Sequence, residues 1–293
     1  MNETNPPLPS LKDLDVWLTE CEAQVPGLRP GVAAGIVWTQ KGIQKTSVSL
    51  VYLPGYSATR GETFPVPDRV AAALGANLFY ARLSGHGGLP EGHRDVTAEQ
   101  WCEDARQALK IGRLLGDKVV VIGTSTGGTL ATLLVLDESA PGPDAVVLIS
   151  PNLTLKDRSS EILRLPGKNA LLSMLVPEVT KTPSRGPLNE QFWDLVHHRH
   201  SLIPMMQLVH RARTRDFQRW KLPTLVVYDL DDPVVDEKVT QKLFSRVPSP
   251  LITLHRWHTA PGDDSHVLAG DALSPGANDR MTALLTDYLK GVL

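Results

Sequence analysis

Hydrophobic residues are most continuous at residues 119–122, where three valines and an isoleucine follow one another. A run of β-branched side chains predicts a strand that is buried on both faces, which is typical of the centre of a parallel sheet. A short turn rich in glycine and threonine follows, and apolar residues then recur with helical spacing from Leu130 to Leu136. The pattern therefore predicts a strand, a tight turn and a helix in direct succession.

A similar alternation extends over most of the chain. Short apolar runs predict further strands at residues 33–38, 46–53, 76–83, 144–150, 222–228 and 251–257. Helical spacing predicts helices at residues 11–25, 66–74, 97–115 and 278–289, with a capping box at the start of the third. A hairpin-like turn is expected at residues 40–42, between the first two strands. Alternating strands and helices predict an α/β fold, with a mostly parallel sheet covered by helices on both faces.

The alternation stops between residues 151 and 220. Apolar residues in this stretch have helical spacing and stand among prolines, arginines and histidines. Strand pattern returns at Leu222. We therefore expect two parts: a core made of residues 1–150 and 221–293, and a helical cap at residues 151–220 that covers the site.

Composition is that of a globular protein and argues against several classes of function. Of 293 residues, 42% are hydrophobic and 21% are charged, which provides ample material for a core. The net charge of −2 gives no electrostatic basis for binding nucleic acid or an anionic membrane. The two cysteines, Cys21 and Cys102, indicate neither a disulfide framework nor a cysteine-based zinc site. Because the chain shows no signal peptide and no apolar run long enough to span a membrane, we expect a cytoplasmic protein.

The turn after the central strand, Gly123-Thr124-Ser125-Thr126-Gly127, has the pattern Gly-x-Ser-x-Gly. Between a strand and a helix this pattern is typical of a nucleophile elbow, in which a strained backbone projects the serine hydroxyl outward. Glycine is expected at 123 and 127 because side chains there would block the close approach of strand and helix. The N–H of Thr126, at the positive end of the helix, would point to the position of an oxyanion. The alternative is a glycine-rich turn with a surface serine, and the flanking strand and helix argue against it.

A serine hydroxyl becomes an effective nucleophile only when a base removes its proton, and that base needs an acid to orient it. In open α/β sheets such groups lie beyond the carboxyl ends of the strands. Asp229, Asp231 and Asp232 follow one predicted strand, and His258 and His266 follow the last one. Serine, aspartate and histidine thus occur in the chain order that a nucleophile elbow requires.

Three motifs together resemble α/β-hydrolases of the serine aminopeptidase and monoacylglycerol lipase group. They are Gly123–Gly127, Asp232-Pro233-Val234-Val235 and Ser265–Asp271, and the resemblance extends from about residue 47 to the C-terminus. It implies the α/β-hydrolase fold with a helical cap insertion.

The resemblance also implies roles for three residues: Ser125 as nucleophile, Asp232 as acid and His266 as base. In such enzymes the acid directly precedes Pro-Val-Val or a close variant, a context that here belongs to Asp232 and not to Asp229 or Asp231. His258 is the alternative base, and the family-like Ser-His-Val sequence favours His266.

A second oxyanion donor is expected in the loop that begins at Pro54. The resemblance would place His-Gly here, whereas this chain has Pro54-Gly55. Proline has no N–H and cannot donate. Gly55 would let the backbone pass close to a substrate, and the N–H of Tyr56 is the candidate donor.

Three other features have alternative interpretations. His197-His198-Arg199-His200 could suggest a metal site, but ligands so close in sequence cannot all face one ion, so we expect a solvated cap helix. Gly85-His86-Gly87-Gly88 lacks the lysine and spacing of a phosphate-binding loop, and the resemblance implies a structural turn near the pocket. Leu171-Leu172 and Met205-Met206 are expected in the core, unless the cap uses some of them to line an acyl pocket.

The leading hypothesis is a serine hydrolase that needs no cofactor or metal and cleaves small-molecule carboxylic esters through an acyl-enzyme on Ser125. The first alternative is an aminopeptidase or amidase with the same triad, which would use a carboxylate such as Glu178, Glu190 or Asp194 to bind a substrate ammonium group. The second is a non-catalytic ligand receptor on the same fold, and an intact set of Ser125, Asp232 and His266 argues against it.

Overall fold

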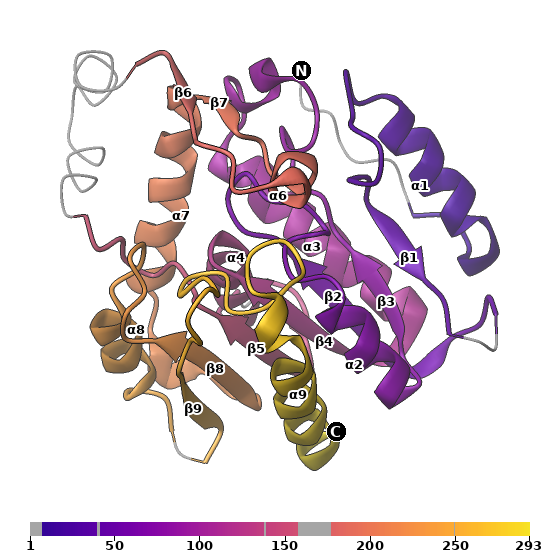
Figure 1. The fold of residues 1–293 in the computed structure, drawn as a ribbon. Helices are drawn as coiled ribbons and strands as arrows, with labels where there is room; N and C mark the ends of the chain where they lie inside the picture. Colours follow the sequence, from indigo (N-terminus) through magenta and orange to yellow (C-terminus); the bar gives the residue numbers. More distant parts are fainter. Residues whose placement is uncertain (1–7, 40–41, 138, 158–176, 249) are drawn as a thin grey trace.

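The computed structural model describes residues 8–39, 42–137, 139–157, 177–248 and 250–293. At its centre is a seven-stranded sheet in the order β1-β3-β2-β4-β5-β8-β9 (Figure 1). The strands are β1 (Gly35–Val37), β2 (Thr46–Leu53), β3 (Asn77–Tyr80), β4 (Gly116–Thr124), β5 (Ala145–Ile149), β8 (Thr224–Asp229) and β9 (Ile252–Trp257). All neighbouring strands are parallel except β1 and β3. The predicted mostly parallel sheet is confirmed.

Strand β4 lies in the middle of this sheet and is buried on both faces, as its sequence predicts. Val119 and Val121 pack into the hydrophobic cluster on one face, and Val120 and Ile122 pack into the cluster on the other. All four side chains are fully buried. Burial of a valine or isoleucine side chain contributes about 1.5–3 kcal/mol, so the strand that leads to Ser125 is held firmly.

Helices cover both faces of the sheet, as predicted. Helices α2 (Val66–Leu74) and α9 (Asn278–Val292) lie in front of the sheet in Figure 1 and pack against each other. Helices α3 (Ala98–Leu115), α4 (Thr126–Val135) and α7 (Leu202–Arg213) contribute to the cluster on the opposite face. Helices α1 (Leu14–Ala23) and α8 (Glu237–Phe244) add side chains to the same cluster.

Local signals account for several helix ends. The predicted capping box starts α3, because the Gln100 N–H donates to the Thr97 hydroxyl while the Thr97 N–H donates to the Gln100 side chain. Helix α2 ends at Gly75, which adopts the left-handed conformation. Short 3-10 turns occur at Leu11–Asp13, Pro90–His93, Arg199–Ser201, Phe217–Arg219 and Pro275–Ala277.

The expected hairpin between the first two strands is wrong. Strand β1 pairs antiparallel with β3, and β2 lies on the other side of β3. The turn itself lies partly outside the described residues, at 40–41. Strands that are adjacent in sequence often form a hairpin. Here β3 lies between β1 and β2 and forms a ladder of hydrogen bonds with each of them.

The segment expected to form a helical cap contains helices and also strands. Its described residues form β6 (Val179–Lys181), α6 (Pro187–Phe192), β7 (Val196–His198) and α7. Strands β6 and β7 form a separate antiparallel pair, which helical spacing did not predict. Residues 197–200, expected in a solvated helix, instead lie in β7 and the following 3-10 turn, where His197 and His198 are buried.

Helix α7, in the same segment, packs on α3 and α4. Met205 and Met206 are buried in the main hydrophobic cluster, in agreement with the expectation that they belong to the core. Leu171-Leu172 lie outside the described residues. In the part of the chain that the structure describes, no helix has the length and apolar character needed to cross a membrane.

Candidate active site

Ser125 lies at the tip of the turn between β4 and α4 with a strained backbone. Its φ of 51° and ψ of −114° fall in a region that non-glycine residues rarely occupy. A Cβ on Gly127 would lie 2.0 Å from the Leu53 carbonyl oxygen, and a Cβ on Gly123 would lie 2.4 Å from the Gly127 carbonyl oxygen. Both positions therefore require glycine for the reason expected from the sequence: strand and helix approach too closely for a side chain.

The structure brings Ser125, His266 and Asp232 together in one row of hydrogen bonds. The Ser125 Oγ is 3.0 Å from His266 Nε2, and His266 Nδ1 is 2.7 Å from Asp232 Oδ2. A carboxylate can only accept, so Nδ1 carries the proton and Nε2 is free to accept from the serine hydroxyl. This arrangement can remove the serine proton.

Asp232 is held by its own backbone neighbourhood. Its second oxygen, Oδ1, accepts hydrogen bonds from the N–H groups of Val234 and Val235 at 2.7 and 3.0 Å. The side chain is fully buried. The Pro-Val-Val sequence after the acid thus has a structural use, because two of its backbone amides fix the carboxylate that faces His266.

The alternative acids and base occupy other positions. The Asp229 carboxylate accepts from the N–H and hydroxyl of Thr259, and Asp231 is exposed. The carbonyl oxygen of His258 accepts from Arg280. Neither Asp229 nor Asp231 is hydrogen-bonded to His266 in the described part of the chain.

Charges around His266 stabilise its protonated form. Burial is the largest single influence and would lower its pKa, but the hydrogen bond and charge of Asp232 together with the charges of Asp264 and Glu62 outweigh burial, so the pKa is raised above the usual imidazole value. Asp264 adds to this effect, and its carboxylate also accepts from the N–H groups of His266 and Val267, both at 2.7 Å. Asp264 was not assigned a role from the sequence. Its signal was an aspartate two residues before His266, since aspartate side chains often accept from backbone N–H groups two or three residues later.

The Thr126 N–H and the loop after β2 flank Ser125. Thr126 is the first residue of α4, where amide groups have no partner within the helix. A Cβ on Gly55 would lie 3.3 Å from the Ser125 Cβ, so the loop passes directly beside the serine. The Gly55 N–H donates to Glu62 at 2.8 Å, which leaves the next amide, that of Tyr56, as the candidate donor in this loop.

Ser57, the residue after Tyr56, is held on both sides. With φ at 61°, it has the left-handed backbone that disfavours side chains. Its N–H donates to His86 Nε2 at 2.9 Å, and its carbonyl accepts from the Asp194 N–H at 2.7 Å. Burial lowers the pKa of His86 to about 3, so its ring stays neutral and able to accept. His86 thus gives the Gly85–Gly88 turn a structural role.

A buried network surrounds the Tyr56 ring. The ring has edge contacts with His86, His93, Trp101 and His197, and its hydroxyl lies 2.5 Å from the Ser201 hydroxyl. Although several histidines gather here, no group of three or more His, Cys, Asp or Glu among the described residues is placed to hold a metal ion. Asp194 and its partners, which sequence reasoning did not connect to this loop, thus help to hold the backbone beside Ser125.

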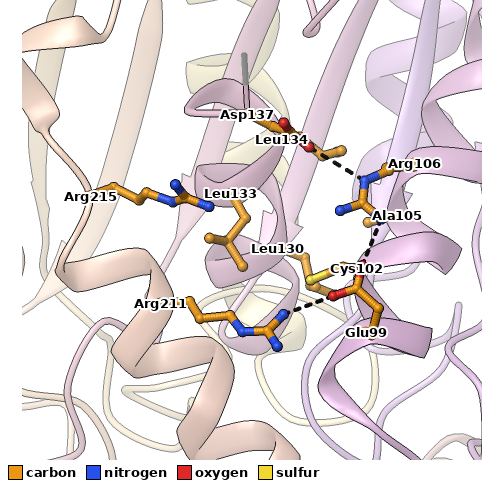
Figure 2. A pocket seen from close by; sticks show the side chains of 10 residues that line it. All are labelled: Glu99, Cys102, Ala105, Arg106, Leu130, Leu133, Leu134, Asp137, Arg211 and Arg215. Carbon is orange, nitrogen blue, oxygen red and sulfur yellow. Dashed lines mark hydrogen bonds and ion pairs between the residues drawn. The ribbon is translucent and has the colours of Figure 1, made fainter. Parts of the chain in front are cut away.

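A separate pocket of about 290 Å³ lies between α3, α4 and α7 (Figure 2). Two of the three arginines that line it form ion pairs: Arg106 pairs with Glu99 and Asp137, and Arg211 also pairs with Glu99. The residues that line it are Glu99, Cys102, Ala105, Arg106, Leu130, Leu133, Leu134, Asp137, Arg211 and Arg215. None of them belongs to the row at Ser125.

Comparisons with known proteins agree with this architecture. Residues 46–261 match the family described as serine aminopeptidase, S33. No curated protein matches the chain.

Solved structures of lipolytic enzymes have a similar fold. A structure of the metagenome-derived lipolytic enzymes LipS and LipT has a TM-score of 0.72 and 16% identity, covering 90% of this chain and 99% of that one. A soluble variant of monoglyceride lipase from Saccharomyces cerevisiae, in complex with a substrate analog, has a TM-score of 0.69 and 14% identity, covering 92% and 96%. The monoacylglycerol lipase of Paleococcus ferrophilus has a TM-score of 0.65 and 15% identity, covering 87% and 98%. At these identities the likeness shows the fold, and it confirms the expected α/β-hydrolase class.

Proposed function

Because the chain belongs to the serine aminopeptidase S33 family of hydrolases, we propose that it cleaves carboxylic esters through an acyl-enzyme on Ser125. The observation that carries this proposal is the row from Ser125 through His266 to Asp232, with spacings of 3.0 and 2.7 Å. A serine in a strained turn, a base within reach and a buried acid are the three parts that nucleophilic catalysis needs.

The proposed reaction has two steps. Ser125 Oγ attacks the ester carbonyl carbon while His266 Nε2 takes the hydroxyl proton, and the Tyr56 and Thr126 amides donate to the oxyanion. The bond to the leaving alcohol breaks as His266 returns its proton to the alcohol oxygen. His266 then takes a proton from a water molecule that attacks the acyl carbon. The bond between the acyl carbon and Ser125 Oγ breaks as His266 returns this proton to Oγ, and the carboxylic acid leaves.

Esters are favoured over peptides because the carboxylates that could bind a substrate ammonium group are poorly placed. Asp194 is buried, with its oxygens accepting from Arg29, His93 and Gly87. Glu178 and Glu190 are exposed, and Glu178 lies 3.3 Å from His198 Nε2.

Monoacylglycerol-like esters are the narrower proposal within this class. Two of the similar structures are monoglyceride or monoacylglycerol lipases. We infer further that residues 151–220 include a cap that contacts the acyl chain, since Arg185 pairs with Asp264 beside His266 and so ties this segment to the site.

The test is a panel of p-nitrophenyl esters of increasing acyl length, with an aminoacyl p-nitroanilide in parallel. Wild-type protein should hydrolyse the esters, and Ser125→Ala should reduce kcat by roughly 10⁶-fold, since removal of the nucleophile leaves only the remainder of the site. Ser139→Ala, at an exposed serine, is the matched control and should retain full activity.

The other outcomes select the alternatives. Turnover of the anilide without any ester would indicate an aminopeptidase. A wild-type protein that hydrolyses neither substrate, and whose Ser125 does not react with a fluorophosphonate, would indicate a receptor.

A further inference from the structure

Glu62 is a buried carboxyl group beside the candidate site that the proposed reaction does not use. It lies in the loop between β2 and α2 and is 2% exposed. No ion pair joins it to an arginine or lysine among the residues that the structure describes. Burying a carboxyl group without a cation is costly unless its oxygens accept hydrogen bonds, so the partners of the Glu62 oxygens are informative.

Both oxygens of Glu62 face the turn beside Ser125. Oε2 accepts from the Gly55 N–H at 2.8 Å and from the Tyr52 hydroxyl at 2.7 Å. Oε1 packs against Gly55, since a Cβ on Gly55 would lie 2.5 Å from it and 3.3 Å from the Ser125 Cβ. The carboxyl group of Glu62 and Ser125 therefore both lie close to Gly55.

The hydrogen bond to Glu62 decides which amide of this loop is available. Pro54 has no N–H, and the N–H of Gly55 is directed to Glu62. The backbone then continues to Tyr56 and to Ser57, whose own N–H is taken by His86. Among residues 54–57, the N–H of Tyr56 is therefore the one available to donate to an oxyanion.

We infer that Glu62 is a positioning residue of the proposed hydrolase: it holds the Gly55 amide so that the neighbouring Tyr56 N–H points to the oxyanion formed on Ser125. This inference rests on the proposed function. Glu62 touches neither substrate nor the reacting atoms, and it acts through the backbone of the turn.

The charge of Glu62 also acts on the base. Burial raises the pKa of Glu62 to about 7, although hydrogen bonds from Gly55 and Tyr52 and the nearby His266 oppose this shift. When ionised, Glu62 raises the pKa of His266, as do Asp232 and Asp264. Tyr52 is the other titratable group that contacts Glu62, and its pKa is raised well out of the neutral range. Removing the charge at position 62 should therefore lower the pKa of His266.

Two substitutions separate the hydrogen bond from the charge. Glu62→Gln keeps a carbonyl oxygen for the Gly55 N–H and removes the charge. We expect kcat within a few-fold of wild type at the pH optimum, with the acidic limb of kcat/KM moved to lower pH because His266 becomes neutral at lower pH. Glu62→Ala removes the acceptor and should reduce kcat roughly 10²-fold with little change in KM, as for the loss of one oxyanion donor.

Asp104→Asn is the matched control. Asp104 on α3 is also a carboxyl group with a raised pKa, of about 6, and it also accepts a backbone N–H, that of Ser84. It does not contact Gly55 or His266, so its variant should keep the wild-type pH profile. If Asp104→Asn moves the acidic limb as far as Glu62→Gln does, the shift is not specific to the site and the charge of Glu62 does not act on His266.

NMR titration of the His266 ring gives a readout that depends neither on turnover nor on the Glu62→Ala variant. Circular dichroism would check that Glu62→Ala is folded. The His266 pKa should be lower in Glu62→Gln than in wild type, and an unchanged pKa with an unchanged acidic limb would overturn the effect of the Glu62 charge on the base. If wild type hydrolyses esters and a folded Glu62→Ala variant keeps full activity, the inference that Glu62 is a positioning residue is overturned. Absence of Ser125-dependent turnover in wild type would instead reject the proposed function.

Discussion

At the residue scale, Asp232 differs from its neighbours Asp229 and Asp231 in its hydrogen bond with His266. Its two oxygens have separate partners, with Oδ1 accepting from two backbone amides and Oδ2 accepting from His266. Because the backbone fixes the carboxylate, the carboxylate in turn fixes the tautomer of His266. Replacing one carboxylate oxygen of Asp232 with the NH₂ group of asparagine should therefore disturb the orientation of His266 without removing His266.

Asp232→Asn should reduce kcat by roughly 10⁴-fold, because an amide no longer holds His266 in the tautomer that accepts from Ser125. Steady-state hydrolysis of a p-nitrophenyl ester is the measurement. Asp231→Asn, one residue away and exposed, is the control and should behave as wild type. Equal losses in the two variants would show that Asp232 is not the acid.

Residue identities in the row at Ser125 were accessible from sequence because short motifs surround them. The glycines of the elbow and the Pro-Val-Val after Asp232 each reflect a local backbone requirement, and local requirements leave a local signature. Glu62 and Asp194 carry no such signature. Their partners are distant in the chain or lie in irregular loops, so only the folded structure shows their use.

At the element scale, the contact between β2, β4 and α4 is the tightest in the site. The glycine at the start of α4 lets the helix approach the end of β2, where the carbonyl of Leu53 would be 2.0 Å from a Cβ at position 127. The obstacle is backbone on a central strand and cannot rotate aside. Any added side chain must displace the helix, the strand or both.

Gly127→Ala should therefore lower the free energy of unfolding by about 3 kcal/mol or more, at the upper end of the cost of overpacking a core. Thermal or urea unfolding measures this loss, together with the yield of folded protein. Gly291→Ala on α9 is the control, because a Cβ there meets open space, and its stability should be unchanged or slightly higher. Wild-type stability in Gly127→Ala would contradict the close packing of β2 on α4.

Elements whose apolar pattern is strong were predicted well, and those with long-range pairing were not. Residues 66–74 form a helix with the predicted bounds, since its apolar face and its glycine end are both local signals. The pairing of β1 with β3, and the β6–β7 pair, depend on segments that meet only after folding. Sequence spacing alone carries no information on such partners.

At the scale of the whole molecule, Asp194 joins three regions of the chain. It accepts from Arg29 in the N-terminal segment and from His93 and Gly87 in the loop after β3, while its own amide donates to Ser57. Its side chain is 4% exposed. A hydrogen bond from His93 is the main influence that outweighs burial and lowers the pKa of Asp194 to about 2.

Asp194→Asn should reduce the free energy of unfolding by about 3–5 kcal/mol near neutral pH, because it leaves buried donors and a cation without their carboxylate. The pKa of Asp194 is depressed in the folded state, so its contribution is present above the unfolded value of about 4 and is lost as the pH falls towards 2. Urea unfolding across this range should show the gap between variant and wild type closing below about pH 4.

Asp95→Asn serves as the comparison, since Asp95 pairs with Arg94 at an exposed position. Its stability should match wild type at every pH, because surface ion pairs contribute little. A variant at Asp194 that is as stable as the one at Asp95 would show that the network does not hold these regions together.

The sequence by itself determined the fold class and the bounds of the strongest elements. Hydrophobic periodicity and a short glycine motif also placed Ser125 in a tight turn, because both are properties of neighbouring residues, whereas Asp232 and His266 were implied by the resemblance to a family. Only the tertiary structure decided which strands pair and how α7 packs. It alone showed that Asp194, distant in the chain, holds the loop beside Ser125, and that Glu62 folds back onto Gly55 within that loop, because neither contact follows from a local motif.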